Sequence, residues 1–399
     1  MAAADATATT PPAPPLPDDI LVEIFLLLPT KSVLRFRAVC TPWRLLLSDP
    51  TFVREHHRRA PHAILLSNPI IDNGDAISAL LFPYADQSTA APLYCGTTCQ
   101  QTSLHGCSDG LLLLSWSRFP VGEGDATGRN YYRYFLCNPA TREMASLPAD
   151  LDSEDFVCFV GFYRHEPTAE YRALGYNSRS PWSIGHRYEY LVAAPGQQSA
   201  RKLEPTDVWT SADCINSRLD DRPVIHRGCL HWMSLFYSKG AVVFDTISEE
   251  FRPMRGPLDG DARMDRMIGR LVALDGTLGA SVFVECEGLL KVWVLESYEE
   301  EAWAFRYSID VGFLEPKGGS PRFTTLAHES VDGDAVILAS DKKRCGVYSL
   351  RSGVVVSTSH ESFHGDLEAT IHVYQESLAR VAPEGVGERH PPIGVNPWH

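Results

Sequence analysis

The sequence has no apolar run long enough to cross a membrane. Its most hydrophobic stretch, residues 20–28, contains eight apolar residues out of nine, whereas a membrane-spanning helix needs about 20. No basic residue precedes this stretch and no small-residue cleavage site follows it, so the pattern is not that of a signal peptide. The sequence also lacks an Asn-x-Ser/Thr glycosylation site. These absences predict an intracellular protein of the cytoplasm, the nucleus or both, with no membrane partner.

Positive charge is also scarce. The chain has 36 Lys and Arg against 50 Asp and Glu, which gives a formal net charge of −14. A general nucleic-acid binder needs a basic face to neutralise phosphates, so none is expected here. The local exception is the REHHRR segment at residues 54–59. It is either a small basic patch or, as we expect, the solvated end of a helix, where cations suit the helix dipole.

None of the ten cysteines belongs to a Cys-x-x-Cys pair. Several lie in apolar stretches such as residues 156–160, which indicates buried free thiols in a reducing compartment. Cys95, Cys99, His105 and Cys107 have the residue types of a zinc site, but their spacing matches no common finger. His105, like the histidine pair in the REHHRR segment, is interpreted as a surface or loop histidine. We therefore predict no metal and no cofactor.

Composition divides the 399 residues into four parts. Residues 1–15 are rich in Ala, Thr and Pro and are predicted to be disordered. Residues 16–60 have a helical pattern. Residues 61–383 alternate short apolar runs with Gly, Pro, Asn and Asp turns, which is typical of strands. Residues 384–399 form a flexible tail. The predicted fold class is α+β multidomain, with a small N-terminal three-helix domain followed by an all-β domain.

Capping residues and prolines divide the helical region into three predicted helices. In chain order these signals are Asp18 or Asp19, Pro29, Thr30, Thr41 with Pro42, and Asp49 with Pro50. A domain below about 40 residues usually needs outside support. We therefore expect a partner protein to cover the apolar side chains left over, among them Leu21, Phe25 and Leu28. The alternative is a helical hairpin that packs on the chain's own β domain, because apolar helices are usually core.

Turn motifs recur along the β region. Asn138, Thr141 and Glu143 occupy the same relative positions as Asp245, Ser248 and Glu250, between two apolar runs in each case, and residues 348–354 form a looser copy. An Asn or Asp side chain at such a position accepts hydrogen bonds from the backbone further along the turn. Further hairpins are predicted at Arg227-Gly228 and Asp275-Gly276. Recurring hairpins favour a β-propeller of about six to eight blades over a large sandwich or barrel.

The helical region closely resembles an F-box. The matching positions are Leu16-Pro17, Ile20, Leu21, Ile24, Leu28-Pro29, Lys31-Ser32-Val33, Arg35-Phe36, Val39-Cys40, Trp43-Arg44, Ser48-Asp49-Pro50 and Phe52. The resemblance implies docking onto a Skp-type adaptor, which connects to the cullin and RING subunits of an SCF ubiquitin ligase. It implies an adaptor-binding face of Leu16, Pro17, Ile20, Leu21, Ile24, Phe25, Leu28, Pro29, Val33 and Leu34. The implied F-box core consists of Phe36, Val39, Cys40, Trp43, Leu46 and Leu47.

The β region resembles the F-box-associated domain of large plant F-box families. The segments that carry the resemblance begin at Cys107, Asn138, Phe159, His226, Phe244 and Lys291. Together the two resemblances imply the substrate receptor of a ubiquitin ligase, whose β domain binds a target protein, not identified by the sequence, for ubiquitin-dependent degradation.

Two alternatives to a substrate receptor remain: a non-degradative scaffold bound to the adaptor, and a propeller enzyme. No enzymatic activity is expected, because Ser183 lacks the first glycine of a nucleophile elbow. The chain also has no phosphate-binding loop.

Overall fold

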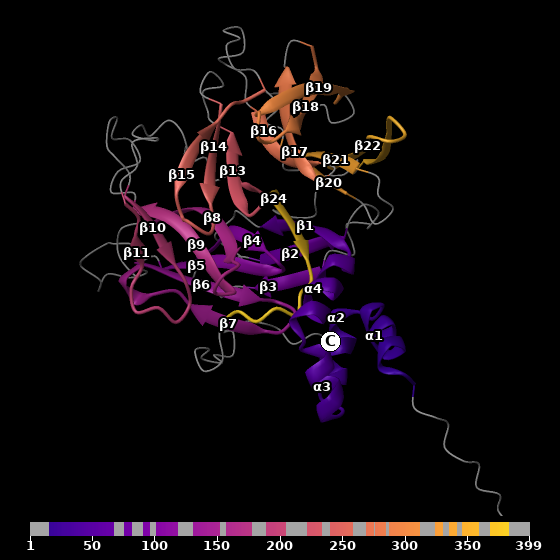
Figure 1. The fold of residues 1–399 in the computed structure, drawn as a ribbon, viewed down its shortest axis with the longest axis vertical. Coiled ribbons are helices and arrows are strands. Elements are labelled where there is room, and N and C mark those ends of the chain that lie inside the picture. Colours follow the sequence, from indigo (N-terminus) through magenta and orange to yellow (C-terminus); the bar gives the residue numbers. More distant parts are fainter. Residues whose placement is uncertain are drawn as a thin grey trace, which may run out of the picture.

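Four helices open the chain in the computed structural model, and twenty-four strands follow among the described residues (Figure 1). The structure describes residues 16–67, 76–81, 91–95, 101–118, 131–151, 157–177, 189–204, 222–233, 240–257, 269–274, 276–284, 287–311, 324–329, 335–340, 345–358 and 368–382. The predicted tails at 1–15 and 384–399 lie outside these ranges. A short helical part is followed by an all-β part, as the amino-acid sequence predicts.

The helices are α1 (Asp18–Leu26), α2 (Thr30–Phe36), α3 (Thr41–Leu47) and α4 (Pro50–Arg59). The prediction of three helices was wrong, because Asp49 and Pro50 begin a fourth helix. The Asp49 carboxylate accepts hydrogen bonds from the backbone nitrogens of Thr51 at 2.8 Å and Phe52 at 3.3 Å, and these bonds lower its pKa. An acidic cap followed by proline is a start signal, although the same pair is compatible with the end of the preceding helix.

The first three helices begin one residue before or at their predicted caps. Their N-cap positions are occupied by Pro17, Pro29 and Cys40, none of which makes a side-chain capping bond. Both prolines have φ near −60° and an extended ψ, so the chain turns into the helix at the next residue. Asp18, Thr30 and Thr41 are therefore the first residues of their helices rather than caps.

The strands form six four-stranded antiparallel sheets. The first sheet has the order β24 (Glu368–Gln375), β1 (His62–Ser67), β2 (Ala76–Leu81), β3 (Ala91–Cys95), and the second has the order β4 (Gln101–Ser108), β5 (Leu111–Arg118), β6 (Tyr131–Asn138), β7 (Glu143–Ser146). The short 3-10 helix Ala149–Leu151 follows. The third sheet contains β8 (Val157–His165), β9 (Glu170–Asn177), β10 (Tyr190–Ala193) and β11 (Arg201–Lys202).

The remaining three sheets have the same meander order. The fourth contains β12 (Val224–His226), β13 (Cys229–Met233), β14 (Ala241–Asp245) and β15 (Phe251–Met254). The fifth contains β16 (Gly269–Leu274), β17 (Thr277–Val284), β18 (Leu289–Ser297) and β19 (Ala302–Asp310). The sixth contains β20 (Thr324–Glu329), β21 (Ala335–Ser340), β22 (Cys345–Ser349) and β23 (Val354–Thr358).

The predicted Asn and Asp turns are confirmed. Asn138 ends β6 and Asp245 ends β14, and each side-chain oxygen accepts hydrogen bonds from the backbone nitrogens two and three positions later, at 2.8 to 3.3 Å. The residue four positions later has a positive φ in both turns, 60° and 57°. In the looser copy the Ser349 hydroxyl accepts a bond of 3.1 Å from the nitrogen three positions later, and Gly353 takes the positive φ.

The two predicted glycine hairpins are also present. Arg227 and Gly228 join β12 to β13 with φ values of 49° and 72°, the combination that a two-residue hairpin of the primed type requires. Gly276 joins β16 to β17 with φ 69°, and its neighbour Asp275 lies outside the described residues.

Apolar clusters fill the spaces between successive sheets. Trp232 of β13 is buried among side chains of the third sheet, and its Nε1 donates a hydrogen bond to the Val160 carbonyl at 3.0 Å. Similar clusters join the first sheet to the second, the second to the third, the fourth to the fifth and the fifth to the sixth. In addition, β20 of the sixth sheet contacts β24 of the first. Each sheet is thus packed against the next one along the chain.

The segment after β24, residues 376–382, joins the helices to the sheets (Figure 1). Val381, 3% exposed, packs in the cluster between the second and third sheets. The Asn138 side-chain nitrogen donates hydrogen bonds to the carbonyls of Ser377 at 3.1 Å and Ala379 at 2.7 Å. Between these two carbonyls, Leu378 is 1% exposed and belongs to the helical core, which also contains Phe25, Leu26, Val33, Leu47 and Phe52.

Polar contacts at α4 reinforce this junction. The ring Nδ1 of His57 lies 3.0 Å from the Glu376 carbonyl, and the Gln375 side chain donates to the Ala60 carbonyl at 2.8 Å. The small helical core therefore receives support from its own chain. We had expected the support of this core to come from a partner protein.

Replacing Leu378 by alanine is expected to destabilise the helical region. Truncation of a buried leucine costs about 2–5 kcal/mol, because it leaves a cavity. The matched control is Leu45→Ala, whose side chain is 69% exposed and whose loss should change stability by no more than about 0.5 kcal/mol. Thermal unfolding of the two full-length variants, followed by circular dichroism, compares them. Equal midpoints would show that Leu378 does not support the core.

Candidate functional site

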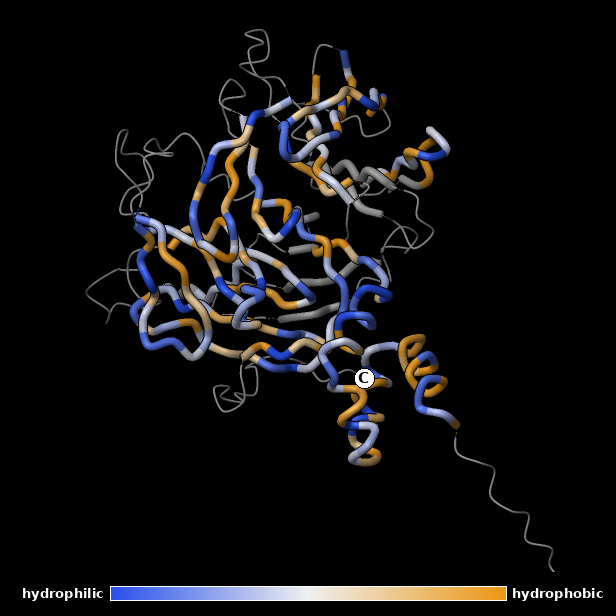
Figure 2. The backbone as a smooth tube through the Cα atoms, in the orientation of Figure 1, coloured by the Kyte–Doolittle hydropathy of each residue, from blue (hydrophilic) through white to orange (hydrophobic). Residues whose placement is uncertain are grey.

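One side of α1 and the residue two positions before it carry apolar side chains that the described residues do not cover. Leu16, Ile20, Ile24 and Leu27 are 55%, 47%, 42% and 78% exposed. Ile20 and Ile24 lie in α1 and Leu27 is its C-cap, so spacings of four and three residues place these three on one side of the helix, and Leu16 precedes the helix by two residues. Figure 2 shows α1 as a mainly hydrophobic helix at the outer side of the helical part. We call these four residues the α1 face.

The opposite side of α1 is buried in an aromatic cluster. The Phe25 ring lies 5.1 Å from the Trp43 ring at 73° and 5.5 Å from the Phe36 ring, between centroids. Phe36 and Trp43 meet edge to face at 5.6 Å. Such tilted arrangements are the favourable ones for aromatic pairs. The cluster fixes the rotation of α1 about its axis, and so determines which of its apolar residues remain outside.

Charged side chains also connect the helices. The Arg37 guanidinium donates two hydrogen bonds to the Leu47 carbonyl, at 2.6 and 3.1 Å, and thereby joins α2 to the end of α3. Arg59 of α4 donates to Glu55 at 2.7 Å and reaches Glu23 of α1 at 3.2 Å. Hydrogen bonds from Arg58 and Arg59 lower the pKa of Glu55 to about 2. The basic end of α4 is therefore paired within the domain.

The structure distributes the predicted adaptor-binding residues over three environments. Leu16, Pro17, Ile20, Ile24 and Pro29 are exposed, and Leu21, Leu28 and Leu34 are partly buried against the helical core. Phe25 and Val33 are buried, at 3% and 0% exposure, and are not available to a partner on this surface. Leu27 is highly exposed and was missed, although its position three residues after Ile24 completes the spacing of the α1 face.

The predicted core residues lie in two environments. Leu47 is fully buried, and Phe36, Trp43 and Leu46 pack against the same cluster. Val39 and Cys40 were assigned to the core wrongly, because both are exposed. The reason is that α2 ends at Phe36, so these two residues lie in the connection to α3 rather than on a helical stripe.

Two histidines are more buried than the sequence predicts. His56 is 4% exposed, and its Nε2 lies 2.9 Å from the Leu28 carbonyl. His105 is partly buried, with its Nε2 2.7 Å from the Ser115 hydroxyl. Both were expected at the surface or in loops. Of the possible zinc ligands, Cys99 lies outside the described residues, and burial raises the pKa of the Cys107 thiol to about 12. The absence of a metal site stays a prediction.

Within the ranges that the structure describes, no helix is both long and apolar enough to span a membrane. An exposed apolar helix face on a small domain, next to a domain of repeated sheets, is typical of proteins that act by binding other proteins.

Comparison with known proteins identifies the family. Residues 100–317 match the family described as F-box associated beta propeller domain, and residues 14–59 match the family described as F-box-like. The first match covers more than half of the 399 residues. The chain belongs to this family of F-box proteins with an F-box-associated domain.

Similar proteins from Arabidopsis thaliana agree with this assignment. An F-box/kelch-repeat protein is 23% identical over 320 residues, which are 74% of this chain and 79% of the relative. Two F-box proteins are 26% and 24% identical, and the alignments cover 76% and 84% of this chain and 74% and 89% of the relatives. A solved structure, the β-propeller domain of Cps50 (Swd1) from Myceliophteria thermophila, is 9% identical over 75% of this chain and 87% of its own, with a TM-score of 0.35, too low to carry an argument.

We expect the helical part to lose stability on acidification. The Leu28 carbonyl accepts from the Nε2 of His56, which places a proton on Nε2, and the buried Nδ1 has no hydrogen-bond partner among the described residues. Burial lowers the pKa of His56. In the unfolded chain His56 binds a proton as pH falls through about 6.5, whereas in the folded chain it binds this proton only at lower pH. The contribution of the neutral His56 ring to the free energy of unfolding is therefore fully present above about pH 6.5 and is lost as pH falls below it.

The test compares wild type with His56→Gln at about pH 7.5 and about pH 5, where the histidine of an unfolded chain is mostly neutral and mostly charged. Hydrogen exchange in α4 reports local stability. The variant is expected to show a smaller difference between the two pH values than the wild type. An identical difference would mean that His56 does not produce the pH dependence.

Proposed function

We propose that this F-box protein is the substrate-recognition subunit of an SCF-type ubiquitin ligase. The observation that carries the proposal is the α1 face, four exposed apolar side chains on a domain whose other large apolar residues are mostly packed. Contiguous exposed apolar residues are typical of protein-binding sites. The resemblance to F-boxes assigns this face to a Skp-type adaptor, and through it to a cullin and a RING subunit.

Val39 and Leu45 extend the proposed adaptor site beyond α1. They are 62% and 69% exposed and lie between α2 and α3 and on α3. Pro17 and Pro29, both exposed, stand at the beginnings of α1 and α2. A helix that presents apolar residues at spacings of three and four fits a groove or a neighbouring helix of a partner. Phe25 and Val33 stabilise the site from beneath and do not contact the adaptor.

We infer that the β part is a closed six-bladed propeller. Six four-stranded antiparallel sheets in succession, five of them meanders and each packed on the next, support this arrangement. The pairing of the last strand, β24, with β1 and its contact with β20 support closure of the ring between the sixth sheet and the first. A propeller presents its connecting loops on rigid faces, which suits recognition of a target protein.

In this role the chain carries out no bond chemistry. It would hold its target near the ubiquitin-loaded enzyme and so raise the effective concentration of the target there. The proposed ligase subunit acts inside the cell, in the cytoplasm, the nucleus or both. A non-degradative scaffold would bind the same adaptor and target without target ubiquitination, so an ubiquitination assay with a co-purified target separates the two. A propeller enzyme would turn over a substrate without the adaptor.

We expect Ile24→Asp to weaken adaptor binding at least tenfold while the fold is kept. Ile24 is 42% exposed in the free chain, so a carboxylate is tolerated there until the partner desolvates it. The matched control is Ile247→Asp in the turn after β14, where the isoleucine is 61% exposed and far from the helices in sequence. The affinity of each full-length variant for a purified Skp-type adaptor is measured by calorimetry.

Phe25→Ala provides the contrast, because its side chain is buried in the aromatic cluster. This variant should lose adaptor binding together with helical circular dichroism, whereas Ile24→Asp should lose binding alone. Wild-type affinity of Ile24→Asp would show that the α1 face is not the adaptor site.

A further inference from the structure

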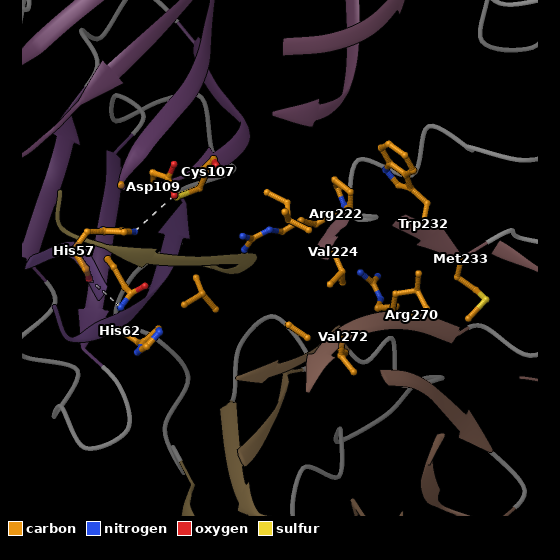
Figure 3. Close-up of a pocket in the computed structure, with 18 of the residues that line it drawn as sticks. His57, His62, Cys107, Asp109, Arg222, Val224, Trp232, Met233, Arg270 and Val272 are labelled. Atoms are coloured by element: carbon orange, nitrogen blue, oxygen red, sulfur yellow. Dashed lines mark hydrogen bonds and ion pairs between the residues drawn. The ribbon is translucent and has the colours of Figure 1, made fainter. Parts of the chain in front are cut away.

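A cavity of about 320 Å³ lies between the first strands of several sheets. Its lining comes from the end of β4, from β12, β16 and β24, and from His57 of α4 (Figure 3). Small-molecule sites occupy about 300–1,000 Å³, so the cavity has the volume of a site for a compact ligand. It lies apart from the α1 face and has no part in the proposed adaptor site.

Among the described residues, two arginines and one carboxylate line this cavity. The carboxylate is Asp109, and it is already engaged: the Tyr171 hydroxyl donates to it at 3.0 Å, and His57 Nε2 lies 4.0 Å away. Arg222, directly before β12, makes no hydrogen bond or ion pair with any residue of the described ranges. Figure 3 shows Arg222 reaching from beside β12 into the cavity, toward the end of β4 and β24. Arg270 lines the cavity from β16.

The groups nearest to Arg222 do not supply the missing negative charge. Burial raises the pKa of the Cys107 thiol to about 12, so this neighbour is a neutral thiol. Burial also lowers the pKa of His372, which interacts with Arg222, well below its usual value, so this ring is neutral. The same desolvation lowers the pKa of Arg222 itself, although a guanidinium stays protonated in proteins. Among the described residues, the groups that interact with Arg222 are thus uncharged, and the carboxylate of Asp109 lines the same cavity bonded to Tyr171.

Arg222 is half-buried and has no partner among the described residues, so its charge carries a desolvation cost that an anion entering the cavity would reduce. A guanidinium binds carboxylate or phosphate through two parallel hydrogen bonds. The rest of the lining is largely apolar, with Val224, Trp232 and Val272 among its side chains. In a chain of net charge −14, Arg222 supplies a local positive charge that attracts anions, whereas Arg270 has an interaction of its own.

We propose that this cavity binds a small organic anion. Its carboxylate or phosphate pairs with Arg222, and its apolar part lies against Val224 and Trp232. The proposal goes beyond the ligase role and does not depend on it. The same oxyanion could be carried by a free molecule or by an acidic side chain of a bound protein. The cavity volume of about 320 Å³ is at the lower end of the range for small-molecule sites and therefore favours a free molecule as the ligand.

The test measures, by calorimetry, the binding of defined probes to the full-length chain, which carries a solubility tag and is purified without the adaptor. The probes are benzoate, phenyl phosphate, inorganic phosphate, neutral benzamide and a glutamate hexapeptide. Benzoate or phenyl phosphate should bind, and benzamide should bind at least tenfold more weakly. Binding of neither aromatic anion overturns the proposal, as does equal binding of benzamide. Binding of the hexapeptide alone, or of inorganic phosphate alone, overturns it as well.

Matched arginine variants locate the site. Arg222→Gln should weaken binding of the aromatic anion at least tenfold, and Arg222→Lys should keep part of it. Arg227→Gln changes the same charge in the adjacent turn, where the side chain is 52% exposed and pairs with Glu299, and should bind like wild type. Equal loss in Arg222→Gln and Arg227→Gln, or no loss in either, contradicts the assignment.

Stability without ligand separates a binding role from a structural one. If Arg222 is an unpartnered cation, Arg222→Gln leaves the melting temperature of the ligand-free chain unchanged or raises it. Addition of the bound anion should then raise the melting temperature of wild type but not of this variant. A lower melting temperature of ligand-free Arg222→Gln would show that Arg222 supports the fold, and the proposal would fail.

Discussion

One buried asparagine side chain connects the two parts of this protein. Asn138 has no exposed surface; its oxygen closes the turn after β6, and its nitrogen donates to the carbonyls of Ser377 and Ala379. A buried donor that loses its partner costs about 1–3 kcal/mol, so these bonds hold the segment after β24 in place. The segment in turn inserts Leu378 into the helical core. The turn of one sheet therefore determines where the helices sit.

This connection matters for the proposed ligase role. A receptor subunit works by holding its target within reach of the ubiquitin-loaded enzyme, and the gain in effective concentration depends on the geometry of the link. Here the helices do not hang on a flexible linker, because His57, Gln375 and Leu378 join α4 and the helical core to the β part. The α1 face and the sheets are consequently held in one orientation, and a target bound to the β part would be presented in a fixed direction.

The sequence predicts those features whose causes are local. The Asn138 and Asp245 turns and the Arg227-Gly228 hairpin follow from residues within a few positions of each other, and all are present. Periodicity alone does not predict which side of α1 stays exposed. Eight of the nine residues at 20–28 are apolar, so two sides of the helix could equally well face the core. Packing of Phe25 against Trp43 decides between them. Leu378 joins the core from the other end of the chain and leaves no local pattern.

The Asn138→Asp variant separates the turn after β6 from the hydrogen bonds by which the Asn138 amide joins the two parts of the protein. Aspartate keeps the turn, as Asp245 shows at the equivalent position, but it cannot donate to the two carbonyls. Asp245→Asn is the matched control. Hydrogen exchange measured by mass spectrometry should be faster throughout α1 to α4 in Asn138→Asp, with the fourth and fifth sheets unchanged, and should match wild type in Asp245→Asn. Wild-type exchange of the helices in Asn138→Asp would show that the Asn138 amide does not join the two parts.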